Sequence, residues 1–330
     1  MKLFDCTLRD GANVVGNGFS AALTTGIVEA LLACGINSIE MGHAKGLGAG
    51  VKMNAPAPLT DEEYMKLAAP YLSKGEIGMF MLARCADADA VRMAADYGLG
   101  FIRVGMDASD GETAVEAVRM VKAAGLKCRY SLMKGYVSTV KDLADEAAML
   151  ADCGVDAITI MDSAGTMLSR EAAEYVRALK NRVSIPVGFH GHSNLGLSQA
   201  NALSAVEAGA DEVDCGLLGM ARSAGNCTTE IAAAVLQRQG MLKEIDLFGL
   251  LEYLDEKLIP AMREYDYRAA VTPADLVLGL AGCHSSFLGR FRQIADEEKV
   301  PLYRLICAVS AKDRKAPSEA LMRAEARRLK

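Results

Sequence analysis

Short apolar runs alternate with longer amphipathic stretches along most of this chain. Eight runs of β-branched and apolar residues predict strands, at 3–7, 38–41, 77–82, 101–105, 127–132, 157–161, 187–190 and 212–216. Alanine-rich segments with helical periodicity lie between them, among them 21–34, 87–97, 111–124, 140–153 and 169–181. Strands that alternate with helices in this way indicate repeated βα units around a parallel sheet.

Several predicted helices end in the same way. Gly35, Gly125, Gly154 and Gly209 each follow a helical segment and precede the next strand after a brief turn. Glycine at such a position suits a left-handed helix cap. Eight units with these short returns favour a closed (β/α)8 barrel, a TIM barrel, over a doubly wound sheet, which usually has fewer strands and reverses its order midway.

The periodic alternation stops before the end of the chain. We assign residues 1–238 to the barrel and residues 239–330, whose pattern is helical throughout, to a small helical C-terminal domain. No low-complexity segment or flexible linker separates the two, so we expect this domain to pack on the barrel.

Composition limits what kind of molecule this is. The 330 residues are 51% hydrophobic and 24% charged, enough for a large core, and the net charge of −6 with interspersed signs argues against a nucleic-acid or anionic membrane surface. The nine cysteines are scattered and odd in number, which is typical of reduced, buried thiols. The N-terminus lacks a signal-peptide pattern and no apolar run reaches about 18 residues, so we expect a cytoplasmic protein.

A pair of histidines at the end of the seventh predicted strand is a candidate metal site. Because side chains alternate along a strand, His190 and His192 point to the same side, about 6 to 7 Å apart along the chain. An isolated His-x-His pair more often has one core and one solvent-facing imidazole. Here the segment 5–11 (DCTLRDG) adds a carboxylate at the end of another strand. Two imidazoles and one carboxylate leave open positions on a divalent ion.

Barrel enzymes carry their chemistry on the loops that follow the carboxyl ends of the strands. The predicted strand ends of this chain supply an unusually polar set of side chains, namely Arg9, Asp10, Asn13, Glu40, His43, Arg103, Ser131, Lys134, Asp162, Ser163, His190, His192 and Asn226. A barrel that served only as a scaffold would rarely collect these residues at one rim. The sequence therefore predicts a site there.

Three of these segments, 5–11 (DCTLRDG), 190–195 (HGHSNL) and 216–226 (GLLGMARSAGN), resemble the signatures of the DRE-TIM metallolyases. That superfamily includes 2-isopropylmalate and homocitrate synthases, hydroxymethylglutaryl-CoA lyase and the 4-hydroxy-2-oxovalerate aldolases. The aldolases match best, because 39–43 (IEMGH), 161–165 (MDSAG) and 285–288 (SSFL) also resemble their pattern. The resemblance spans nearly the whole chain.

The resemblance implies a divalent ion, Mn²⁺ or Mg²⁺, held by Asp10, His190 and His192, with Asn226 as a further candidate ligand. An ion with such a mixed nitrogen and oxygen ligand set and open positions suits a Lewis acid that chelates the carboxylate and carbonyl oxygens of a 2-oxo acid.

The resemblance also implies roles for neighbouring residues. Arg9 would bind substrate and stabilise an enolate oxygen, unless it only forms a salt bridge with Glu40 at the barrel rim. Ser163 would hydrogen-bond the substrate or cap the turn that follows it. We place His43 on the substrate side, where it would shape the loop after the second strand. In that loop, 46–50 (GLGAG) lacks the full spacing of a phosphate-binding turn, and we expect a flexible substrate-covering loop through Pro58 with no helix beginning there.

Two positions depart from the aldolase pattern. Asn13 stands where those enzymes carry a histidine that acts as the catalytic base, and an amide cannot take a proton at neutral pH. His284 stands where they carry a tyrosine beside that base. We therefore predict that His284 is the proton acceptor and that Asn13 orients it, the alternative being that His284 only packs at the domain junction.

The predicted function is that of a metal-dependent class II aldolase, which cleaves a 4-hydroxy-2-oxo acid to pyruvate and an aldehyde or runs the reverse condensation. Two alternatives stay open, namely a Claisen-type synthase that joins an acyl-CoA to a 2-oxo acid, and a barrel that has lost catalysis. Like the aldolases it resembles, the chain is expected to form a homo-oligomer and to pair with an acylating aldehyde dehydrogenase.

Overall fold

The computed structural model describes residues 1–270, 272–283, 285–313 and 316–330. These residues form two compact units, Met1–Asp246 and Leu247–Lys330. Residues 239–246, which the sequence pattern groups with the C-terminal domain, belong to the first unit. There the Asp246 N–H donates to the Cys34 carbonyl at 3.0 Å.

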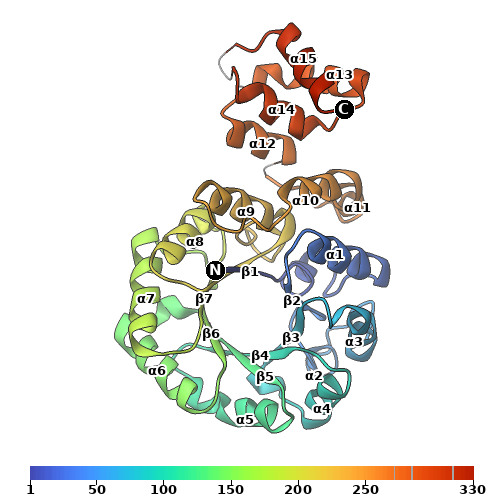
Figure 1. Ribbon diagram of the computed structural model, residues 1–330. Coiled ribbons are helices and arrows are strands. Elements are labelled where there is room, and N and C mark those ends of the chain that lie inside the picture. Colours follow the sequence, from blue (N-terminus) through green and yellow to red (C-terminus); the bar gives the residue numbers. More distant parts are fainter. Residues whose placement is uncertain (271, 284, 314–315) are drawn as a thin grey trace. The chain divides into compact units, whose positions relative to one another are not determined.

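The first unit is a closed barrel of eight parallel strands that neighbour one another in chain order (Figure 1). The strands are β1 (Lys2–Asp5), β2 (Ser38–Met41), β3 (Glu76–Leu82), β4 (Phe101–Asp107), β5 (Lys127–Met133), β6 (Ala157–Asp162), β7 (Val187–Gly191) and β8 (Glu212–Cys215). Pairing of β1 with β8 closes the ring. The predicted (β/α)8 barrel is confirmed.

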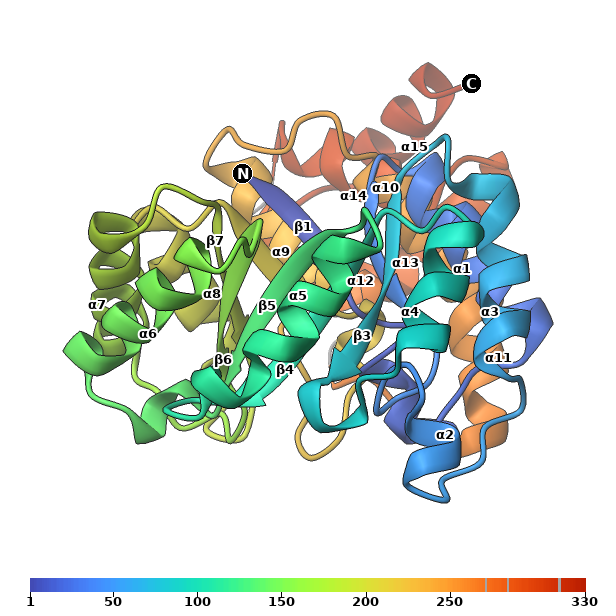
Figure 2. The same ribbon diagram turned by 90° about the horizontal axis from the view of Figure 1, so that it is seen from below.

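Helices surround the ring of strands (Figure 1), and Figure 2 shows α4 and α5 over the outer face of β3, β4 and β5. They are α1 (Ala21–Ala33), α2 (Ala49–Lys52), α3 (Asp61–Ala68), α4 (Ala88–Asp96), α5 (Val115–Ala123), α6 (Val140–Asp152), α7 (Ser169–Arg182), α8 (Ser198–Glu207) and α9 (Thr229–Arg238). Their inner faces bury side chains such as Leu31, Val118, Leu150 and Leu179 without exposure to solvent. Each such side chain contributes about 1.5 to 3 kcal/mol of hydrophobic stabilisation.

The glycines at the helix ends adopt the predicted left-handed conformation. Gly35, Gly125, Gly154 and Gly209 have φ of 86°, 79°, 98° and 102°. A side chain would be strained at each of these angles, so glycine ends the helix and turns the chain into the next strand.

Two local expectations need correction. Strand β1 ends at Asp5, two residues earlier than predicted, because the Asp5 carboxylate accepts the Thr7 N–H at 2.9 Å and starts a turn. The predicted helix 111–124 begins with a 3₁₀ turn, Gly111–Ala114, and becomes α-helical only at Val115.

A buried polar seam joins the first and last strands to the start of α9. The Thr229 hydroxyl donates to Asp5 at 2.7 Å, and the Glu230 carboxylate accepts the Leu218 N–H at 3.2 Å. Burial raises the pKa of Asp5 to about 6 and that of Glu230 to about 7. The native barrel therefore favours the protonated form of both groups.

These raised pKa values predict a barrel that loses stability as the pH rises. A carboxyl group with a raised native pKa contributes stability fully below its unfolded pKa of about 4.5 and loses it as the pH passes the native value, here near 7 for Glu230. Glu230→Gln should remove about 2 to 3 kcal/mol of the fall in unfolding free energy between pH 4.5 and 8. Urea unfolding at several pH values measures this, with exposed Glu112→Gln as control. An unchanged slope in Glu230→Gln would contradict it.

The second unit contains the helices α10 (Leu247–Tyr253), α11 (Ile259–Met262), α12 (Pro273–Ala281), α13 (Leu288–Glu298), α14 (Leu302–Ser310) and α15 (Glu319–Arg328). A π-helical turn, Leu254–Leu258, joins the first two. Within the described residues of this unit, all regular structure is helical, as predicted.

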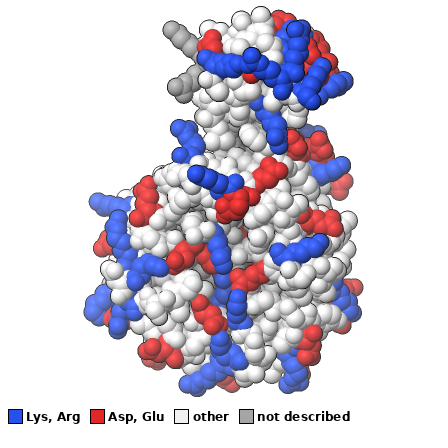
Figure 3. Space-filling model, in the orientation of Figure 1, with Lys and Arg blue, Asp and Glu red and all other residues white. Residues whose placement is uncertain are grey.

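Three surface and compositional expectations can be compared with the structure. Acidic and basic side chains are interspersed over the barrel face in Figure 3. The nine cysteines are thiols that form no disulfide, and seven of them are buried. No helix among the residues that the structure describes is long and apolar enough to cross a membrane.

Candidate active site and metal centre

The loops after β1 and β7 bring three donor side chains together. His190 Nε2 and His192 Nε2 are 3.4 Å apart, and Asp10 Oδ2 lies 3.6 Å from the first and 3.8 Å from the second. All three residues are buried. The structure thus places Asp10, His190 and His192 as the sequence predicts, with three ligand-type atoms facing one point.

The size and donor chemistry of this triangle fit a divalent ion. A point equidistant from the three atoms lies about 2.1 Å from each, which is a usual metal-to-ligand distance. Asn226 lies beside it, since its amide nitrogen donates to Asp10 Oδ2 at 2.9 Å. The Asn226 Oδ1 atom is buried with no hydrogen-bond partner among the described residues, so a further oxygen donor is free at this place.

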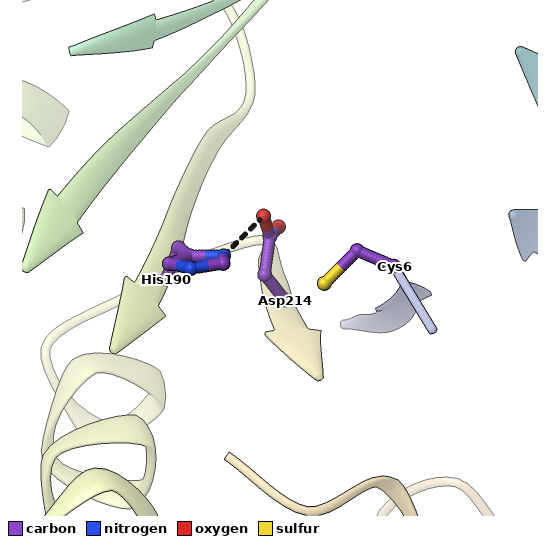
Figure 4. Close-up of side chains that lie close together, drawn as sticks. All are labelled: Cys6, His190 and Asp214. Atoms are coloured by element: carbon purple, nitrogen blue, oxygen red, sulfur yellow. Dashed lines mark hydrogen bonds and ion pairs between the residues drawn. The ribbon is translucent and has the colours of Figure 1, made fainter. Parts of the chain in front are cut away.

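A buried carboxylate orients His190. Its Nδ1 lies 3.0 Å from Asp214 Oδ2 on β8, the interaction dashed in Figure 4. A proton on Nδ1 leaves the Nε2 lone pair for a metal. Cys6, also drawn in Figure 4, completes a second set of potential ligands with His190 and Asp214. Burial raises the pKa of the Cys6 thiol well above its ordinary value, and Asp214 already pairs with Arg103 and His190, so we assign this set to the support of the first.

A chain of buried charges continues from Asp214 across the barrel. Arg103 donates to Asp214 and, through two nitrogens at 2.6 and 2.7 Å, to Glu40. Glu40 in turn accepts from Arg9, whose Nη1 lies 2.9 Å from Asp10 Oδ1. All of these side chains are almost completely buried, and each charge has an opposite neighbour.

These charges set the protonation of the centre. Burial of Asp10 favours its neutral form, but Arg9 and the two histidines outweigh burial and lower its pKa well below the usual range. Arg103 does the same at Asp214, where the pKa falls to about 2. Burial, and then the neighbouring His190, lower the pKa of His192 to about 4. The centre therefore offers an ionised carboxylate and a neutral His192 imidazole at neutral pH.

Only two of the three guanidinium nitrogens of Arg9 take part in this chain of charges. Its Nε binds Glu40 and its Nη1 binds Asp10, while Nη2 is buried and has no hydrogen-bond partner within the described chain. The side chain also borders the cavity described next. The salt bridge with Glu40 therefore leaves one donor of the guanidinium unused within the described chain.

The centre opens into a cavity of about 160 Å³. Its lining includes Arg9, Asp10, Asn13, Ser163, His190 and His192. Asn13 donates its side-chain amide to the Asp10 carbonyl at 2.9 Å, so it steadies the loop that carries this carboxylate. The Ser163 hydroxyl accepts the Lys134 N–H at 2.9 Å and still borders the cavity.

His43 lies in the loop after β2 and shapes it, as the sequence predicts. Its Nδ1 accepts the Lys45 N–H at 3.0 Å and its Nε2 lies 2.7 Å from the Ala55 carbonyl. Both ring nitrogens therefore hold the loop after β2, and His43 is not among the residues that line the cavity. A short helix, α2, begins in this loop, contrary to expectation. The N–H of Gly48 before it donates to Asp61 at 2.8 Å, so an internal carboxylate occupies that turn.

Gly165 positions the segment that carries His192. The His192 N–H donates to the Asp162 carbonyl at 3.2 Å, and the Leu195 N–H donates to the Gly165 carbonyl at 3.2 Å. Gly165 has φ of 59°, and a Cβ there would lie 2.6 Å from both the His192 carbonyl oxygen and the Asn194 nitrogen. Only glycine permits this close approach.

Gly165→Ala should therefore displace His192 and lower metal affinity by about 10- to 100-fold, the range seen when support of a ligand is lost. Gly196→Ala is a matched control, because Gly196 also has a positive φ of 72° but no described atom lies within 4 Å of its added Cβ. Titration calorimetry with Mn²⁺ measures both variants. Equal affinities would show that Gly165 does not position the ligand.

Some residues of this region escaped the sequence analysis. Asp214 was taken as part of an apolar strand, although a second acid two residues earlier, Glu212, signals a charged inner face. The cavity-lining Lys45 and Arg84 lie in no motif, and Arg222 lies within the segment 216–226 but has no role predicted from it. His284, the predicted base, lies outside the described residues.

The sequence is similar to a known protein family over most of its length. The HMGL-like family model matches residues 1–255. The 4-hydroxy-2-oxovalerate aldolase of Carboxydothermus hydrogenoformans is 34% identical over 300 residues, which cover 91% of this chain and 88% of that protein. The enzyme of the same name from Desulfitobacterium hafniense is 34% identical over 289 residues, 87% of this chain and 86% of that protein.

The chain belongs to the HMGL-like family. Its curated relatives place it among the lyases of that family. Among solved structures, hydroxymethylglutaryl-CoA lyase from Pseudomonas aeruginosa superposes with a TM-score of 0.68 at 16% identity, covering 84% of this chain and 97% of that one. That likeness concerns the fold of the HMGL-like barrel.

Proposed function

We propose that this protein is a metal-dependent aldolase that cleaves a 4-hydroxy-2-oxo acid to pyruvate and an aldehyde, or joins them in reverse. The observation that carries the proposal is the convergence of Asp10, His190 and His192 beside a free donor of Arg9 in one cavity. The 34% identity to 4-hydroxy-2-oxovalerate aldolases over 91% of the chain supports it.

The three ligands and Asn226 Oδ1 would hold Mn²⁺ or Mg²⁺. Such an ion supplies a Lewis acid for the carboxylate and carbonyl oxygens of a 2-oxo acid. Arg9 Nη2 then donates to the C2 oxygen, where negative charge develops. Ser163, at the edge of the cavity, is the proposed hydrogen-bond donor to substrate, and His43 keeps the neighbouring loop in place.

The bond changes are those of a retro-aldol reaction. A base takes the proton of the C4 hydroxyl, C4 becomes the aldehyde carbonyl, and the C3–C4 bond breaks. Its electron pair passes to C3 and the C2 oxygen to give the enolate of pyruvate, which Arg9 stabilises. A proton then adds to C3 and pyruvate leaves.

The described lining of the cavity contains no imidazole or carboxylate outside the proposed metal ligands. Asn13, an amide, cannot take the proton of the C4 hydroxyl. We therefore retain His284 as the proposed base. His284→Ala should lose the rate and the limb of the pH profile near pH 6 to 7, whereas His43→Ala should keep that limb. A His284→Ala enzyme with both features intact would exclude the assignment.

The proposed reaction is tested by pyruvate release. Protein with Mn²⁺ or Mg²⁺ should form pyruvate from 4-hydroxy-2-oxovalerate, and protein treated with a chelator should not. Thiol release from acetyl-CoA in the presence of a 2-oxo acid would instead support a Claisen-type synthase. No turnover in either assay would support a barrel without catalysis.

An acylating aldehyde dehydrogenase partner and a homo-oligomer remain predictions. Light scattering tests the oligomer, and co-purification with a coexpressed dehydrogenase tests the partner. A monodisperse single chain that retains no dehydrogenase would contradict both.

A further inference from the structure

Three cationic side chains border the proposed substrate cavity besides Arg9, namely Lys45, Arg84 and Arg222. None of the three forms an ion pair with any acidic residue in the described part of the chain, whereas Arg9 is neutralised by Glu40 and Asp10. Asp10 is the sole acidic residue among the described residues that line the cavity. The cavity therefore carries several positive charges that the protein does not balance.

These cations lie on two sides of the proposed metal ligands. Arg222 follows β8, the strand between the two that carry the ligands, and its charge lowers the pKa of both Asp10 and His192. Lys45 and Arg84 follow β2 and β3, on the other side of β1. Around the barrel, the loop after β1 that carries Arg9 therefore lies between Arg222 on one side and Lys45 and Arg84 on the other.

The loop that carries Lys45 is tied to strand β3, which leads into Arg84. Gly46 forms an isolated bridge with Met81, and the Leu47 N–H donates to the Phe80 carbonyl at 2.7 Å. Gly46 has φ of 94°, and a Cβ there would lie 2.6 Å from the Phe80 carbonyl oxygen, so only glycine allows this contact. Lys45 therefore lies on a loop fixed against β3, and the exposed Arg84 follows that strand, so both cations border one wall of the cavity.

The single carboxylate of a simple 2-oxo acid does not supply a counter-charge for the two cations of this wall, Lys45 and Arg84. In the proposed reaction this carboxylate faces the ion and Arg9 donates to the C2 oxygen, and Arg222 borders the cavity on that side. Lys45 and Arg84 are left without a counter-charge. The remaining lining is apolar and suits a short carbon chain, with Ala44, Met53, Phe80, Leu82, Met133 and Met161.

We propose that the preferred substrate is dianionic, a 4-hydroxy-2-oxo acid whose aldehyde fragment carries a second carboxylate that Lys45 and Arg84 bind. This inference rests on the proposed aldolase function. The bond changes are the same retro-aldol steps, so the products are pyruvate and an aldehyde that retains the second carboxylate, such as glyoxylate or succinate semialdehyde. The second carboxylate takes no part in the electron movement and acts only in binding.

Matched substrate pairs test the proposal in the full-length, metal-loaded protein. One pair is 4-hydroxy-2-oxoglutarate and 4-hydroxy-2-oxovalerate, and the other is 4-hydroxy-2-oxopimelate and 4-hydroxy-2-oxoheptanoate. Within at least one pair, kcat/KM for the dianion should exceed that for the monoanion by tenfold or more, mainly through KM. Equal values in both pairs, or a preference for the monoanions, overturn the inference while the aldolase function stands.

Variants of the two cations connect the preference to this wall. Lys45→Gln and Arg84→Gln should each reduce the ratio of dianion to monoanion kcat/KM by about tenfold, because each removes a hydrogen bond between charged groups. Arg119→Gln is the matched control, since Arg119 is exposed on the outer helix α5 and does not border the cavity. Ratios unchanged in both wall variants overturn the assignment.

The same assays separate failure of this inference from failure of the proposed function. If none of the four hydroxy-oxo acids releases pyruvate, the aldolase function itself fails, and the inference fails with it. If acetyl-CoA releases its thiol and Arg84→Gln weakens acetyl-CoA binding, the wall binds a coenzyme phosphate, which also overturns the dianion proposal.

Discussion

Protein purified without chelator is expected to contain about one Mn²⁺ or Mg²⁺ per chain, and His192→Ala to lose both this ion and pyruvate release. The variant removes one of three donors that lie within 3.8 Å of each other. His192 Nδ1 has no hydrogen-bond partner among the described residues, and the ring packs edge-on against His190. Elemental analysis of the metal content and a coupled assay of pyruvate measure the two losses.

His43→Ala is the control for this experiment. His43 is also a buried imidazole, but its nitrogens bind the loop around Lys45 and Ala55, so its variant should keep the metal. Chelation should inactivate the wild type, and Mn²⁺ should restore it. Equal metal content in wild type and His192→Ala would refute the ligand assignment.

Arg9→Lys is expected to lower kcat/KM by about 10²- to 10³-fold, or about 2.7 to 4 kcal/mol of transition-state stabilisation, the cost of removing one oxyanion donor. The guanidinium serves Glu40, Asp10 and the cavity through three different nitrogens. An ammonium is a single compact donor and cannot span the three positions. Steady-state kinetics on a 4-hydroxy-2-oxo acid measures the loss.

Arg129→Lys separates this effect from loss of stability. Arg129 is also buried and paired, with Glu212, and its guanidinium lies 4.6 Å from the Phe4 ring, but it does not border the cavity. This variant should lower the free energy of unfolding and keep turnover. Near-normal turnover in Arg9→Lys, or circular dichroism showing that it does not fold, would remove the proposed role.

The barrel was predictable because local patterns alone specify it. Eight apolar runs separated by amphipathic segments, with glycine at the helix ends, determine strand number and short connections without long-range information. The predictions that failed concern features set by local hydrogen bonds, namely the turn that Asp5 begins and the helix α2 that forms beside Asp61. Each of these features depends on one carboxylate that accepts a backbone N–H, and the periodicity of apolar residues does not reveal such a contact.

The candidate site was predictable for a different reason. Asp10, His190 and His192 sit in motifs, and the closed barrel brings the ends of β1 and β7 to one rim. Lys45 and Arg84 lie in no motif, and the isolated bridge between Gly46 and Met81, which joins the Lys45 loop to β3, exists only in three dimensions. The convergence of these three side chains could therefore be predicted from the sequence, whereas the wall that we propose for specificity could not.

The buried run of charges from Arg9 through Glu40 and Arg103 to Asp214 limits how this centre can be transplanted. A designer who grafts only the three ligands onto another barrel leaves His190 without the acid at its Nδ1 and Asp10 without its arginine. Moving Asp214 as well leaves an uncompensated buried carboxylate unless Arg103 accompanies it, and Arg103 in turn requires Glu40. The smallest portable version of the site is therefore seven residues drawn from β1, β2, β4, β7 and β8 and the loops that follow them.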